Sequence, residues 1–120
     1  MKIEYAQQAI EEWDQDVFTS AELRDGAERS LRHVEEAVEL AQACGVKPEQ
    51  IHRLVDYVFA RPAGEPGQEI AGSLVTLLTA ANVLDVDVAT VFTIELERIR
   101  QPGVIARIRR RQTEKREVTG

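Results

Sequence analysis

The chain has little of what marks secreted or membrane proteins. Its single cysteine, Cys44, cannot form an internal disulfide, which predicts a reducing, cytoplasmic setting. No apolar run approaches the roughly 18 residues that a membrane span requires. The start, Met-Lys-Ile-Glu-Tyr, is too polar for a signal peptide. Aromatic residues make up only 5% of the sequence. Because Ala, Leu, Val, Glu and Arg dominate instead, the composition favours helix over sheet.

What is present fits one soluble globular domain. The 120 residues are 43% hydrophobic and 30% charged, enough for a single core and unlike a disordered chain. We therefore expect one domain over residues 1–120, without a membrane partner.

The net charge of −6 is unevenly distributed along the chain. Residues 1–97 carry a balance of −12, whereas residues 98–120 carry +6. A basic helix or arm from about residue 103 could attract phosphates of a nucleotide or of nucleic acid. It could equally be a solvated, frayed terminus. The acidic remainder argues against nucleic acid as the partner.

The hydrophobic period is helical nearly throughout, with no persistent strand pattern. Helices are expected over about 2–16, 20–45, 48–59, 66–84 and 88–100, with a basic helix after Pro102 and Gly103. Thr19 and Glu22 have the spacing of a capping box, and Gly45 is the expected end of the second helix. The fold class is therefore all-α, a compact antiparallel bundle of about five helices. Five side chains form the expected buried face of the helix at 48–59: Ile51, Leu54, Val55, Val58 and Phe59.

Four carboxylates carry the chemistry. Glu35, Glu36 and Glu39 stand as Glu-Glu-x-x-Glu on one expected helix, and Glu69 opens another. Residues three or four apart share a helix face, so like charges here repel unless a cation lies between them. A hard divalent cation such as Mg²⁺ prefers these oxygen ligands.

The helix at 66–84 has two different faces. One is lined with leucines, and the other carries Glu69 followed by small or polar residues, including Gly72 and Ser73. Such a face suits the wall of a cavity or a close contact between helices. Gly72 in mid-helix costs about 0.8–1 kcal/mol relative to Ala, so we expect a ligand or another backbone to approach it closely.

Together these residues resemble the MazG-like all-α nucleoside triphosphate pyrophosphohydrolases. The shared features are the order Glu-Glu-x-x-Glu, a separating stretch, and a Glu that opens an apolar helix. The segment Tyr-Val-Phe-Ala-Arg-Pro-Ala-Gly-Glu-Pro-Gly-Gln-Glu-Ile-Ala-Gly, at 57–72, is similar to a bacterial and phage branch of that family. In that branch, as here, Gly stands where the family usually has Asp. The resemblance covers about residues 27–111.

The resemblance implies Mg²⁺, with Mn²⁺ as a possible substitute, held by Glu36, Glu39 and Glu69. Water, Glu35 or Glu95 would replace the ligand missing at Gly72. It also implies cleavage of a nucleoside triphosphate into a monophosphate and pyrophosphate, in a homodimer or homotetramer.

The residues that would act on the substrate are chosen from the same chemistry. Glu35 or Glu39 would take the proton from the attacking water. Basic side chains would hold the pyrophosphate, and the candidates are Arg98, Arg109 and Lys115.

Other readings of the same residues remain open. Glu35, Glu36 and Glu39 could be a solvated helix face, with Arg29 and Arg32 one turn away. The protein could bind nucleotide without cleaving it, or assemble without catalysis.

Four single residues have simpler interpretations. Trp13 is expected in the core or in a subunit contact rather than stacked on a base. His33 and His52 are expected on the surface, and Cys44 as a small buried hydrophobe.

Overall fold

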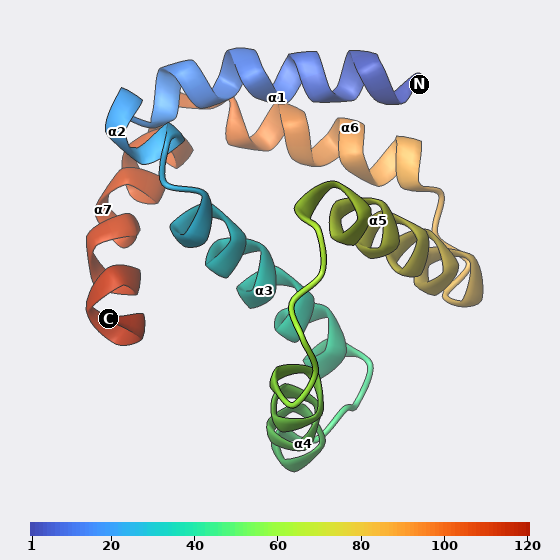
Figure 1. Ribbon diagram of the computed structural model, residues 1–120. Helices are drawn as coiled ribbons and strands as arrows, with labels where there is room; N and C mark the ends of the chain where they lie inside the picture. Colours follow the sequence, from blue (N-terminus) through green and yellow to red (C-terminus); the bar gives the residue numbers. More distant parts are fainter. The chain divides into compact units, whose positions relative to one another are not determined.

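The computed structural model describes residues 1–120 and contains seven helices and no strand (Figure 1). The all-α prediction is therefore confirmed. The helices are α1 (Ile3–Val17), α2 (Ser20–Leu23), α3 (Gly26–Ala43), α4 (Pro48–Phe59), α5 (Pro66–Val83), α6 (Val88–Ile99) and α7 (Pro102–Thr119).

The helix expected over 20–45 is divided in two, because two capping residues follow each other closely. Thr19 forms the predicted capping box with Glu22: the Thr19 hydroxyl accepts from the Glu22 amide, and the Glu22 carboxylate accepts from the Thr19 amide. Six residues later, the Asp25 carboxylate accepts from the Glu28 amide at 3.1 Å and begins α3. Asp25 therefore starts a new helix instead of continuing the old one.

The chain divides into two units. Unit 1 comprises Met1–Arg24 and Leu77–Gly120, and unit 2 comprises Asp25–Thr76. Helix α5 contributes residues to both.

Unit 1 has a small core where α7 packs against α1 and α6. Its buried apolar residues are Ala9, Val17, Ala81 and Leu96. The Trp13 indole donates to the carbonyl of Ile99 at 2.7 Å and meets the Phe18 ring edge to face. Trp13 therefore makes an internal contact, as expected, and ties α1 to the end of α6.

Unit 2 has no buried residue. Of the five residues that α4 was expected to bury, Ile51 is half-buried. The prediction is wrong for Leu54, Val55, Val58 and Phe59, which are 54%, 48%, 44% and 84% exposed. The prediction that Cys44 is buried is also wrong, because the thiol is exposed. The physical reason is common to these exposed residues. The extensive helix contacts join α7 to α1 and α6 in unit 1, and no contact of that extent covers the apolar side chains of unit 2.

Helices α3 and α5 each end in a backbone turn of the same type. At the end of α3, Gly45 adopts φ +84°, the Val46 amide donates to the Ala41 carbonyl, and the Gly45 amide donates to Gln42. This is a Schellman motif, with the expected glycine in the left-handed position. At the end of α5, Val86 and Asp85 donate to Ala81 and Asn82 in the same way, but the left-handed residue is Asp85, with φ +56°.

No single helix is long and apolar enough to cross a membrane, although α5 and α6, bent by 108°, pass that test as a pair by length and composition.

Candidate metal and nucleotide site

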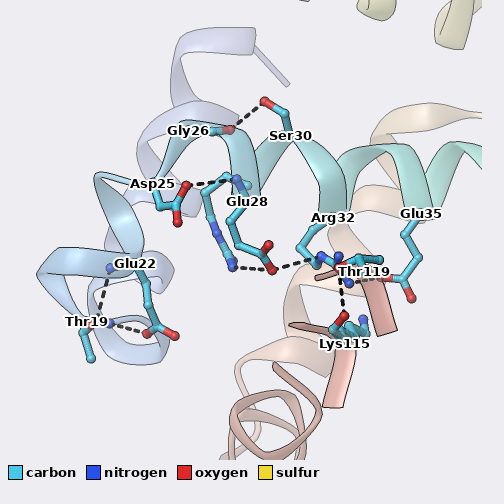
Figure 2. A network of polar contacts seen from close by, with 11 residues as sticks. Thr19, Glu22, Asp25, Gly26, Glu28, Ser30, Arg32, Glu35, Lys115 and Thr119 are labelled. Carbon is cyan, nitrogen blue, oxygen red and sulfur yellow. Dashed lines mark hydrogen bonds and ion pairs between the residues drawn. The ribbon is translucent and has the colours of Figure 1, made fainter. Parts of the chain in front are cut away.

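Helix α3 carries three of the four candidate carboxylates, and one of them belongs to a ladder of ion pairs (Figure 2). The Arg32 guanidinium lies 3.3 Å from the Glu28 carboxylate and 3.2 Å from that of Glu35. These spacings of three and four residues are those at which charges meet on a helix face. Glu35 is thus half-buried and engaged in stabilising its own helix, as the solvated-face interpretation expected.

The other acidic candidates are open to solvent. Glu36 and Glu39 are exposed on α3, and Glu69 is exposed in the first turn of α5. The Glu69 carboxylate lies against Gly64, where a Cβ atom would overlap it. Glycine at 64 therefore leaves room for this side chain.

Glu65 organises the start of α5 and was not singled out from the sequence. Its carboxylate accepts from the amides of Gly67 and Gln68, both at 2.9 Å. These bonds hold the pKa of Glu65 below its usual range, the Gly67 amide having the larger effect. An acidic residue directly before Pro66 at a helix start was the available signal.

One side-chain bond connects α3 with α5 inside unit 2. The Nε2 atom of His33 lies 2.7 Å from the Ser73 hydroxyl. Glu36 follows His33 by three residues, and Glu69 precedes Ser73 by four. Each carboxylate thus lies one helical turn from the same contact, on the same face of its helix as the bonded residue.

The structure does not gather three acidic, histidine or cysteine side chains into a group that could hold a metal ion. Glu36, Glu39 and Glu69 therefore form no cation site within unit 2. Their donor chemistry nevertheless fits Mg²⁺, because all three offer carboxylate oxygens and are accessible. In this arrangement, however, the three carboxylates do not meet around one position.

Gly72 has open space around it: no atom lies within 4 Å of a Cβ built at that position. No other backbone approaches Gly72 closely in this structure, and the alternative expectation, a bound ligand, stays a prediction. The space around residue 72 is wide enough for a carboxylate side chain.

The basic candidates belong to unit 1, and two of them already hold protein groups. Arg98 donates two hydrogen bonds to the Glu95 carboxylate, at 2.7 and 2.9 Å, which lowers the pKa of Glu95. Arg109 donates to the carbonyls of Asp16 and Val17 at the end of α1. Lys115 is half-exposed, and its carbonyl accepts from the Thr119 hydroxyl (Figure 2).

Comparison of the chain with protein-family models, curated proteins and solved structures gives no match. The function is therefore argued from the residues themselves.

Proposed function

We propose that this chain is a Mg²⁺-dependent nucleoside triphosphate pyrophosphohydrolase of the MazG-like type, whose acidic site closes when two copies associate. The observation that carries the proposal is the hydrogen bond between His33 and Ser73. It lies one turn from Glu36 on α3 and one turn from Glu69 on α5. If the two helices approach antiparallel at this contact, both carboxylates lie on the same side of it and reach one cation.

The uncovered faces of unit 2 support the association of copies. A stable interface needs about 800 Å² from each partner. The exposed apolar side chains of α4 would contribute to such a surface, and a homodimer is its simplest cover.

The side chains suit the reaction when they converge. The bound cation would neutralise phosphate oxygens and orient the attacking water. Glu39 is the better base, because the Glu35 carboxylate is paired with Arg32 and Glu39 is exposed. Among the basic candidates, Arg98 and Arg109 already donate hydrogen bonds to groups of unit 1, so binding a phosphate would cost them these bonds.

The decisive experiment measures nucleotide binding and pyrophosphate release together. Isothermal titration should show Mg²⁺-dependent binding of a triphosphate, and Glu36→Gln combined with Glu39→Gln should abolish it without changing the helical circular dichroism. The matched control is Glu11→Gln with Glu12→Gln on α1, which removes the same charge from exposed positions of unit 1. Equal affinity in the α3 double variant would discard the site.

A second candidate function is nucleotide binding without cleavage, and Gly72 favours it. The position where the resembled family usually has Asp carries no side chain, so one ligand is absent. Gly72→Asp tests the two functions directly, because the space around residue 72 accepts the new side chain. Turnover that rises in this variant supports the enzyme. Turnover that is absent in both forms, with binding retained, supports the silent protein.

A further inference from the structure

Unit 1 contains a hollow of about 380 Å³ where the end of α1, the short α2 and the middle of α7 meet. This volume lies in the range of small-molecule pockets. The lining residues are Val17, Phe18, Thr19, Glu22, Arg109 and Gln112.

Gln112 is the unusual member of this set. Its side chain is 8% exposed, and its amide nitrogen is buried without a hydrogen-bond partner. A buried amide without partners destabilises the fold, so such groups are normally satisfied by protein, water or ligand. The amide offers a donor and an acceptor side by side, and turning it by half a rotation exchanges them. The amide nitrogen of Gln112 is therefore a buried donor without an acceptor.

The charges around the hollow favour an uncharged occupant. Arg109 donates to the Asp16 and Val17 carbonyls, which form the negative end of the α1 dipole. The one carboxylate in the lining, Glu22, accepts from the Thr19 amide at 2.8 Å. The cation is thus balanced by an anion and a helix end, and little net charge remains to attract phosphate or carboxylate.

The remaining walls favour a flat molecule. Phe18 lies in the lining, and its ring is held at 87° to the Trp13 indole with centroids 5.9 Å apart. Val17, 3% exposed, adds an aliphatic surface. An aromatic ring with a fixed orientation and an aliphatic neighbour suit the face of a planar ring.

We propose that this hollow binds a neutral planar molecule that carries a hydrogen-bond donor and acceptor side by side, with Gln112 pairing to that edge. A primary aromatic amide and a nucleobase share this chemistry. The site shares no residue with the carboxylates on α3 and α5, so a test of one does not decide the other.

Titration of ¹⁵N-labelled full-length protein with benzamide and with adenine tests the proposal. The Gln112 side-chain NH₂ resonances, assigned by their loss in Gln112→Met, should shift with at least one probe, and the tighter probe tells the amide from the nucleobase. Gln112→Met keeps the side-chain length, should raise the melting temperature of the empty protein, and should weaken binding about tenfold or more. The matched control, Gln7→Met on the exposed face of α1, should change neither.

Benzoate has the same ring as benzamide but bears a charge, and it should bind more weakly. Gln112 resonances that stay in place with both neutral probes in the unmodified protein would overturn the site, whatever the variant does. Equal affinity in Gln112→Met, or tighter binding of benzoate, would overturn the pairing or the charge argument on which the proposal is built.

Discussion

The two units differ in how far they bury their apolar residues. Unit 1 buries Ala9, Val17 and Leu96 and joins distant segments through side-chain bonds such as that from Trp13 to Ile99. Unit 2 has helix caps such as that of Asp25 but buries no apolar residue, and a polar bond from His33 to Ser73 links α3 with α5. Both units therefore form helices, but only the helices of unit 1 pack around a core of buried apolar residues. The comparison shows that unit 2, which carries the candidate carboxylates, leaves its apolar side chains exposed, and this is why we propose that a second copy covers them.

The largest expected effect comes from charging the uncovered face of α4. Leu54→Glu with Val58→Glu should change the stability of an isolated chain little, because both side chains are about half exposed. If a second copy buries them, the loss should raise the dimer dissociation constant at least about a hundredfold. Light scattering across a dilution series measures this. Val118→Glu, at an exposed apolar residue of α7, is the matched control, and equal masses for all forms would contradict the dimer.

The next effect concerns the core of unit 1. Trp13→Ala should lower the free energy of unfolding by about 3 kcal/mol, through lost packing and an unpaired Ile99 carbonyl. Trp13→Phe keeps most of the packing and should cost about 1 kcal/mol. Urea unfolding followed by circular dichroism gives both values. If both variants lower the free energy of unfolding equally, the hydrogen bond to Ile99 accounts for the loss and the packing of the ring does not.

The two Schellman turns allow a paired test with opposite signs. Asp85→Gly should stabilise the protein by about 1 kcal/mol, because glycine adopts the left-handed conformation without strain. Gly45→Ala should destabilise it by about the same amount, although a Cβ there meets no neighbour. Thermal unfolding measures both. Shifts of equal sign would mean that backbone strain does not govern these turns.

The smallest effect is a dependence on pH at the start of α6. Hydrogen bonds from the Thr90 hydroxyl and amide lower the pKa of Asp87. A lowered pKa in the folded state means that the carboxylate stabilises the fold above its unfolded pKa, near 3.9, and that this contribution is lost as pH falls through the folded value. The melting temperature of the protein relative to Asp87→Asn should be constant from pH 7 to 5 and fall below about 4. If the difference in melting temperature between the two proteins is the same at all pH values, the ionised Asp87 carboxylate does not stabilise the fold.

Much of the local structure followed from short-range chemistry. The hydroxyl of Thr19, the glycine at 45 and Pro48 each act within a few residues, so the sequence predicted the capping box and the helix ends. The break at Asp25 was missed, because the expected apolar period continued through it. Whether α4 is covered depends on residues distant in sequence or on another chain. The helical period of apolar residues along α4 does not identify that partner.

The candidate site divides in the same way. Spacing correctly placed Glu36 and Glu39 on one helix face, and it identified Glu69 at the start of another helix. Convergence of the three depends on tertiary packing, and no pattern predicted that Arg32 engages Glu35 or that Arg109 serves α1. The hollow beside Gln112 was not foreseen, because a glutamine within a basic helix carries no signal of burial.

The absence of any buried apolar residue in unit 2 has a consequence for the life of the protein in a cell. Backbone that opens easily is cut easily, so this unit would resist proteases in proportion to how often its apolar faces are covered. If the cover is a second copy, newly made chains at low abundance would be degraded faster than chains above the dissociation constant. The amount of protein would then rise sharply once its rate of synthesis passes a threshold, and the exposed apolar surface of unit 2 would set that threshold.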